Sequence, residues 1–195
     1  MGTLNSSESV RKVIEINDYM LGTMAGGAAD CYFWETNLAR ILKLYELNNG
    51  ERMSISGASQ LFASMMYQYR GRGLSVGTMI AGTDEKGQHL YYLDNDGNRL
   101  EGERFTIGSG GTYAYGVLDT YWRYDLTLEE AVNLGKRAIS EATFQDSASG
   151  GVVRVYHVHS KGWDCLVDAQ DNSELNWEHR NAQKVDLMKG SLFFH

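Results

Sequence analysis

A run of small residues between Gly22 and Trp34 carries the clearest chemical signal in this chain. The run joins a segment with strand propensity to a segment with helical periodicity, and its glycines and alanines leave the backbone open to a bound molecule. The first N–H groups of the helix have no partner within that helix, so they can donate to an oxyanion. Lys12 lies a short strand upstream, where a lysine beside an arginine is more often a solvated strand end than a reactive group.

Three other clusters favour structural interpretations over chemical ones. The glycines of Gly108–Gly111 resemble a dinucleotide loop but lack the later glycine and the βαβ unit that such a loop requires. His157 and His159 share one face of a strand without further metal ligands at suitable spacing, which favours a packed or surface pair. Asp94–Gly97 lacks the downstream glutamate of a calcium loop and is expected to be a hairpin turn. We therefore expect neither a metal nor a cofactor.

The composition predicts a single domain over residues 1–195. The chain is 43% hydrophobic and carries a formal net charge of -7, which argues against a nucleic-acid partner because phosphate binding requires clustered Lys and Arg. No stretch reaches the roughly 20 apolar residues that span a bilayer, so no membrane contact is expected. Cys31 and Cys165 are too few for a disulfide framework, and this indicates an intracellular protein.

Apolar periodicity predicts three helices. Residues at three- and four-residue spacing mark a helix from Gly26 to Asn49-Gly50 and a second one over Ser54–Arg70. A third helix begins at Thr127, whose spacing to Glu130 is typical of a capping box.

Alternating and β-branched residues predict the strands. The expected strands occupy Val10–Asn17, Tyr19–Met24, Leu74–Ala81, Leu90–Leu93, Glu103–Ile107, Val152–His159 and Trp163–Val167. Helix pairs that alternate with antiparallel hairpins predict a layered α+β domain. Residues 181–195 are expected to form a loose C-terminal tail or a partner contact.

Three motifs in order resemble proteasome core particle beta-type subunits with chymotrypsin-like specificity. They are Gly22–Trp34, Gly108–Asp119 and Asp146–Gly151, and the resemblance runs from about Ser9 to about His179. It implies an N-terminal nucleophile hydrolase with a four-layer αββα sandwich. In that family a threonine attacks the substrate and its own α-amino group serves as the general base.

The resemblance also implies roles for individual residues. Lys12 matches the active-site lysine that lowers the pKa of the threonine hydroxyl, and Gly26 matches the oxyanion donor. The groups around the N-terminal amine match Ser109, Asp146 and Ser149. The lining of the specificity pocket matches Val10, Met24, Ala28 and Cys31, and Met24 would favour large apolar side chains.

The family places its threonine and two strands ahead of the segment that matches Ser9. We therefore expect the chain to be N-terminally truncated, to lack the first two strands and to be inactive as written. Thr3 is the one internal candidate nucleophile, and it would lack the strand that positions the threonine in the family.

The implied function is threonine-type cleavage of unfolded polypeptides after large apolar residues. The implied partners are other proteasome alpha and beta subunits in a ring, in the cytoplasm and nucleus. The alternative is a non-catalytic structural or regulatory ring subunit.

Overall fold

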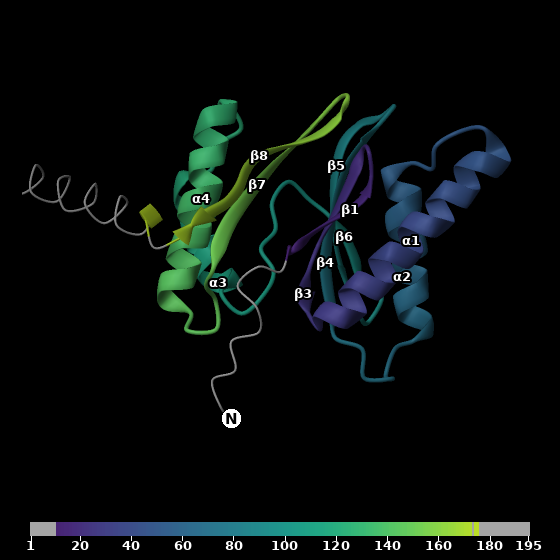
Figure 1. The fold of residues 1–195 in the computed structure, drawn as a ribbon, viewed down its shortest axis with the longest axis horizontal. Coiled ribbons are helices and arrows are strands. Elements are labelled where there is room, and N and C mark those ends of the chain that lie inside the picture. Colours follow the sequence, from purple (N-terminus) through teal and green to yellow (C-terminus); the bar gives the residue numbers. More distant parts are fainter. Residues whose placement is uncertain (1–10, 173, 176–195) are drawn as a thin grey trace, which may run out of the picture. The chain divides into compact units, whose positions relative to one another are not determined.

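The computed structural model describes residues 11–172 and 174–175, which group into two compact units (Figure 1). We call residues 11–108 with 156–165 the sheet unit, and the remaining described residues the helical unit. Both units combine segments from distant parts of the sequence. The single-domain prediction stays a prediction, and the predicted tail, residues 181–195, lies outside the described residues.

The sheet unit is built on an antiparallel sheet. Its strands are β1 (Val13–Asn17), β2 (Met20–Thr23), β3 (Ala25–Gly26), β4 (Val76–Asp84), β5 (Gly87–Asp94) and β6 (Arg99–Glu101). The spatial order is β1-β2-β4-β5-β6, and β3 also pairs with β4. The predicted hairpin at Asn17-Asp18 is confirmed, since Asn17 Oδ1 accepts from the Tyr19 N–H at 3.1 Å and Val13 pairs with Thr23.

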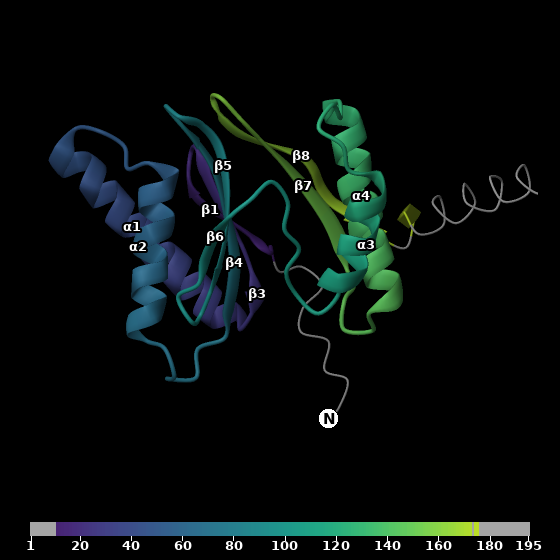
Figure 2. The same ribbon diagram turned by 180° about the vertical axis from the view of Figure 1, so that it is seen from behind.

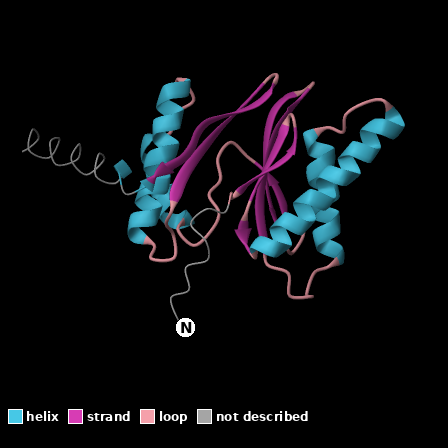
Figure 3. Ribbon diagram, viewed as in Figure 1, coloured by secondary structure: helices cyan, strands magenta, loops and turns pink. Residues whose placement is uncertain are grey.

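The strand predicted over Glu103–Ile107 is wrong, because the strand that pairs with β5 is Arg99–Glu101. A tight turn decides this register. The Gly97 N–H donates to the Asp94 carbonyl at 3.1 Å, which turns the chain at once and sets Arg99 opposite Leu93. Pairing is therefore complete by Glu101, and residues 104–107 form a loop (Figure 3).

The two predicted N-terminal helices are confirmed as α1 (Ala28–Asn49) and α2 (Ile55–Gln68), which cover one face of the sheet (Figure 1). Gly50 ends α1 in the left-handed conformation, and its N–H donates to the Glu46 carbonyl at 2.9 Å. The apolar stripes of α1 and α2 pack on the sheet and form a core with it. Its fully buried side chains include Met20, Leu38, Ile55, Phe62, Met66, Ile80, Tyr91 and Leu93.

The helical unit contains α3 (Gly111–Tyr121) and α4 (Leu128–Gln145), which pack side by side (Figure 2). The predicted capping box of α4 is confirmed, with reciprocal bonds between Thr127 and Glu130. Sequence reasoning missed α3, since its glycines and aromatic residues have low helix propensity. Ala114 packs against Ala138 and Ala142 of α4, and this contact compensates for the weak propensity.

The predicted C-terminal hairpin is confirmed as β7 (Val152–His159) and β8 (Gly162–Asp171). Its base belongs to the helical unit, whereas its tip belongs to the sheet unit. At the tip, Trp163 Nε1 donates to the Asn17 carbonyl at 2.8 Å. Helices packed with antiparallel strands confirm the α+β class.

Candidate active site

Lys12 and Met24 are linked through their backbones. The Met24 N–H donates to the Lys12 carbonyl at 2.8 Å, so the residue before β1 lies beside the residue between β2 and β3. Lys12 is exposed and Met24 is half-buried against the core. The strand pairing therefore places the lysine and the methionine of the family match on one small patch.

The predicted oxyanion donor, Gly26, is the last residue of β3, just before the turn into α1, and its position tolerates no side chain. Its φ of 91° is left-handed, and a Cβ atom there would lie 2.9 Å from the Ser75 carbonyl oxygen. The first helical bond of α1 runs from the Cys31 N–H to the Gly27 carbonyl at 3.0 Å. The N–H groups of residues 28–30 therefore have no acceptor within the helix. This donor-rich turn is compatible with oxyanion binding, which stays a prediction.

The predicted pocket residues differ in exposure. Ala28 is exposed at the start of α1, whereas Cys31 is fully buried and its thiol donates to the Ala25 carbonyl at 3.2 Å. Burial raises the pKa of the Cys31 thiol, and the negative charge of the nearby Glu35 raises it further. Cys31 thus packs beneath the turn. Val10, like the candidate nucleophile Thr3, lies outside the described residues.

The helical unit brings its three predicted site residues together. Asp146 Oδ2 accepts from the Ser109 hydroxyl at 2.5 Å and from the Ser149 hydroxyl at 2.6 Å. The Ser109 bond, the Ser149 bond and an N–H bond from Ala148 lower the pKa of Asp146. Sequence reasoning thus found a hydrogen-bonded cluster whose members are up to 40 positions apart in the chain. Its joining to Lys12 and Gly26, in the other unit, stays a prediction.

The sequence matches the family model described as proteasome subunit over residues 1–158. The chain belongs to the proteasome subunit family. It is 59% identical over 179 residues to proteasome subunit beta type-5-A of Arabidopsis thaliana, a match that covers 92% of this chain and 65% of that protein. It is 54% identical over 183 residues to proteasome subunit beta type-8 of Homo sapiens, covering 94% of this chain and 66% of that protein. The chain thus spans about two thirds of the length of these relatives.

Membership in the proteasome family confirms the resemblance and the predicted α+β fold class of the N-terminal nucleophile hydrolase type. Within the part of the chain that the structure describes, no helix has the length and hydrophobicity needed to cross a membrane. The same residues contain no group of three or more His, Cys, Asp or Glu side chains that could hold a metal ion.

One acidic residue near the site of this proteasome-family chain was missed. Glu35 lies one turn after Cys31 on the buried side of α1, and its carboxyl group occupies the space that a side chain on Gly22 would need. Both carboxyl oxygens lack hydrogen-bond partners among the described residues. Burial raises the pKa of Glu35 to about 8, with Thr78 acting in the opposite direction. The sequence did contain a signal for this buried carboxyl group, because position 35 falls within the apolar stripe from which the helix was predicted.

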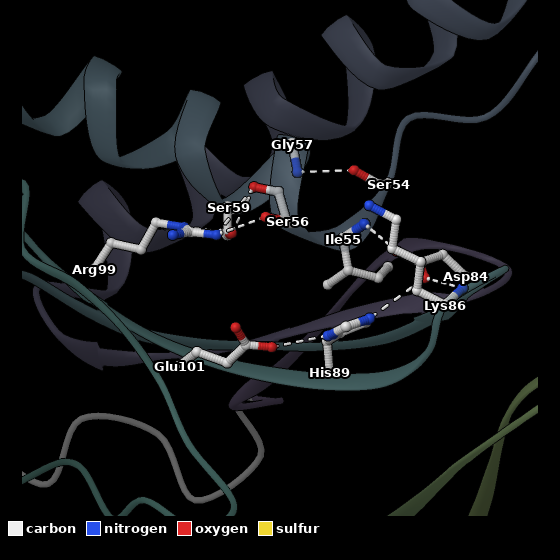
Figure 4. A network of polar contacts seen from close by, with 10 residues as sticks. All are labelled: Ser54, Ile55, Ser56, Gly57, Ser59, Asp84, Lys86, His89, Arg99 and Glu101. Carbon is white, nitrogen blue, oxygen red and sulfur yellow. Dashed lines mark hydrogen bonds and ion pairs between the residues drawn. The ribbon is translucent and has the colours of Figure 1, made fainter.

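A second polar cluster ties α2 to the strands (Figure 4). His89 Nδ1 lies 2.9 Å from Glu101 Oε1, and His89 Nε2 lies 3.4 Å from Asp84 Oδ1. Asp84 Oδ2 accepts from the Ile55 N–H at 2.9 Å, at the first residue of α2. The His89 hydrogen bond lowers the pKa of Glu101. Sequence reasoning could not find this cluster, since its members meet only through the sheet register.

Arg99 forms a second arm of the same cluster. Its Nε donates to the Ser59 hydroxyl and its Nη2 to the Ser56 hydroxyl, both at 2.8 Å, and its guanidinium lies over the Tyr91 ring at 4.3 Å. Burial acts to raise the pKa of Asp84, but N–H donors from Ile55 and Lys86, together with His89, hold it below its ordinary value. These contacts fix the start of α2. None of the residues in this cluster is one of the predicted site residues.

Proposed function

We propose that this chain is a beta-type subunit of the proteasome core particle and supplies much of the active site of a threonine-type endopeptidase. The observation that carries the proposal is the bond between the Met24 N–H and the Lys12 carbonyl. It holds the matched lysine and the matched pocket residue together, just ahead of the Gly26 turn. The 59% identity to proteasome subunit beta type-5-A supports the same assignment.

The proposed reaction begins when a threonine hydroxyl attacks the carbonyl carbon of a peptide bond. The threonine α-amino group takes up the hydroxyl proton and returns it to the departing amine, leaving an ester to the threonine. Water then cleaves the ester and restores the hydroxyl. Lys12 would lower the pKa of the attacking hydroxyl through its positive charge, and the Gly26 N–H would donate to the oxygen that becomes negative.

Asp146 would act on the amine that serves as the base. As a carboxylate with two serine hydroxyl donors, it holds Ser109 and Ser149 in fixed orientations. A fixed polar cluster of this kind can orient an ammonium or amine group without reorganising during the reaction. The same hydrogen bonds lower the pKa of Asp146 and so favour its ionised form.

Met24 would set the preference for large apolar residues before the cleaved bond. Its unbranched thioether packs against the core on one side and can adapt to side chains of different shape. The substrate would be an unfolded polypeptide, and the partners would be other proteasome alpha and beta subunits in a ring. We propose the cytoplasm and nucleus as its location, which imaging of a tagged chain would test.

The test joins a segment that begins with threonine and ends just before Ser9 to this chain, within an assembled ring. We expect cleavage of fluorogenic peptides after large apolar residues, and nearly complete loss of it in Lys12→Ala. Arg11→Ala is the matched control, because it removes the neighbouring exposed cation instead. Met24→Ala should weaken the preference for bulky residues and leave kcat for small ones unchanged.

Without the joined segment, a polypeptide of these 195 residues that begins with Met1 should not hydrolyse the same peptides, because the proposed reaction needs a threonine with a free α-amino group. Turnover that a threonine-directed inhibitor blocks would contradict this expectation. If the joined chain assembles but stays inactive, or if Lys12→Ala is fully active, the proposal fails and the non-catalytic ring subunit replaces it.

A further inference from the structure

The turn that presents Gly26 is held by a residue that the family match did not single out. Asp30 is the third residue of α1, and its Oδ2 accepts from the Ser75 N–H at 3.1 Å. The Ser75 carbonyl in turn accepts from the Gly27 N–H at 2.7 Å. Both backbone polar groups of Ser75 are thus bonded to the start of α1, on either side of residues 28 and 29.

Ser75 also occupies the space that a side chain on Gly26 would need. A Cβ atom on Gly26 would lie 2.8 Å from the Ser75 hydroxyl and 2.9 Å from its carbonyl oxygen. Ser75 immediately precedes β4, whose first residue Val76 pairs with Gly26. Since β4 lies inside the sheet between β2 and β5, Ser75 is attached to a rigid part of the molecule.

We infer that Asp30 is a positioning residue: its carboxylate binds the backbone N–H of Ser75 and thereby fixes the direction of the Gly26 N–H. We call this hydrogen bond between Asp30 and Ser75 the clasp. The inference rests on the proposed function, since it assigns Gly26 to the oxyanion. A donor stabilises a transition state only if it already points at the developing charge, so a loosened turn costs rate even when the donor remains. Asp30 itself touches no reacting atom.

The alternative role for Asp30 is a general one. An acidic residue in the first turn stabilises any helix by its charge, whatever it touches. The N-cap residue of α1, Gly27, has no side chain, and Asp30 directs its carboxylate across to Ser75 rather than back to its own helix. The two roles have different requirements. The hydrogen bond to Ser75 needs an acceptor atom at position 30, whereas the effect on the helix needs a negative charge there.

Asp30→Asn separates these roles. It keeps an oxygen that can accept from the Ser75 N–H and removes the charge, whereas Asp30→Ala removes both. Two controls accompany them. Glu129→Ala removes an acidic residue from the first turn of α4 instead, and Ser75→Ala keeps the backbone groups that form the clasp.

The first measurement is amide hydrogen exchange on the 195-residue chain and needs no activity. In Asp30→Ala, exchange at Gly27 and Ser75 should rise about tenfold, the change expected when one hydrogen bond of ordinary strength is lost. In Asp30→Asn the rise should be at most about threefold, and the two controls should match the unaltered chain. Equal rises in Asp30→Asn and Asp30→Ala would assign the effect to charge alone and overturn the inference.

The second measurement uses the assembled ring with the joined threonine segment. Active sites are counted with a covalent threonine-directed inhibitor, so that loss of folded protein does not imitate loss of rate. Asp30→Ala should lower kcat per counted site about tenfold and change KM less than about twofold, a smaller effect than deleting an oxyanion donor outright.

The outcomes separate the two proposals. If Lys12→Ala is inactive but Asp30→Ala keeps full kcat, the inference fails and the proposed function stands. If the joined chain shows no turnover, the proposed function fails, and with it the assignment of Asp30 to catalysis. In that case the exchange experiment still decides whether the clasp exists.

Discussion

The two units hold their parts of the predicted site by different means. In the sheet unit, Met24 lies against a large core of side chains from both helices and four strands. In the helical unit, the clustered core consists of Ala114, Ala138 and Ala142 with two partly buried neighbours. There, hydrogen bonds from Ser109, Ser149 and Ala148 hold the Asp146 carboxylate. Packing therefore positions Met24, and polar contacts position Asp146.

One carboxyl group in each unit shows an opposite shift of its pKa. Glu35 in the sheet unit is buried, so its proton is held more tightly when the chain is folded. Asp146 in the helical unit is half-buried and accepts three hydrogen bonds, so its proton is held more weakly. Rising pH therefore removes the contribution of Glu35, and falling pH removes that of Asp146. The following predictions test this contrast, beginning with the largest effect.

Glu35→Gln should remove a strong pH dependence from the sheet unit. The pKa of Glu35 is about 8 when folded, against an ordinary value of 4.5, so only the folded state keeps the proton between these values. Its contribution is fully present below pH 4.5 and is lost as pH rises towards 8, by roughly 5 kcal/mol at 1.36 kcal/mol per pKa unit. Denaturant unfolding from pH 5 to 8.5 should show this slope in the unaltered chain and little of it in Glu35→Gln.

The control for this prediction is Glu51→Gln, which removes an exposed carboxylate that accepts from the Tyr45 hydroxyl at 3.4 Å. It should leave the slope unchanged. A slope that persists in Glu35→Gln would show that Glu35 ionises freely in the folded chain.

Truncating one large side chain in each unit should produce unequal losses. Phe62→Ala in α2 removes a fully buried ring and should cost about 3–5 kcal/mol of unfolding free energy. Leu118→Ala in α3 removes a partly buried side chain and should cost about 1–2 kcal/mol. Chemical denaturation followed by local hydrogen exchange measures both losses. Equal losses would contradict the distinction between a packed unit and a polar one.

Removing one helix cap in each unit should produce the smallest effects. Thr127→Ala breaks the capping box of α4, and Ser54→Ala removes the hydroxyl that accepts from the Gly57 N–H at 3.0 Å in α2. Each substitution should lower the free energy of unfolding of its own helix by about 1 kcal/mol. Exchange in the first turn should rise more in α4, because in α2 the Asp84 carboxylate still binds the Ile55 N–H. Similar rises would show that Asp84 does not support α2.

The capping box of α4 also has a defined acid limit. Bonds from the Thr127 N–H, and then from Arg123, lower the pKa of Glu130 to about 2. The contribution of a carboxylate with a lowered pKa is complete above its ordinary value of 4.5 and is lost as pH falls towards 2. The first turn of α4 should therefore fray only in strong acid, which circular dichroism can follow.

Local sequence patterns were sufficient for much of this protein. The stripe from Cys31 to Tyr45 predicted α1, and the spacing of Thr127 and Glu130 predicted the capping box of α4, because both signals depend on spacings of three or four residues within one helix. The family resemblance, rather than any local pattern, grouped Ser109, Asp146 and Ser149, and the structure joins these three by hydrogen bonds. Signals of this kind need no knowledge of how distant segments meet.

Other features depended on contacts that only the tertiary structure decides. The register of β6 depends on the turn that ends at Asn98, and α3 forms because Ala114 meets α4. The clasp between Asp30 and Ser75 joins residues 45 positions apart, and the sheet alone brings them together. Glu35 shows the limit most clearly. Its place on the helix was predictable, but its burial depends on the missing side chain of Gly22 in a neighbouring strand, and burial rather than residue type sets its pKa.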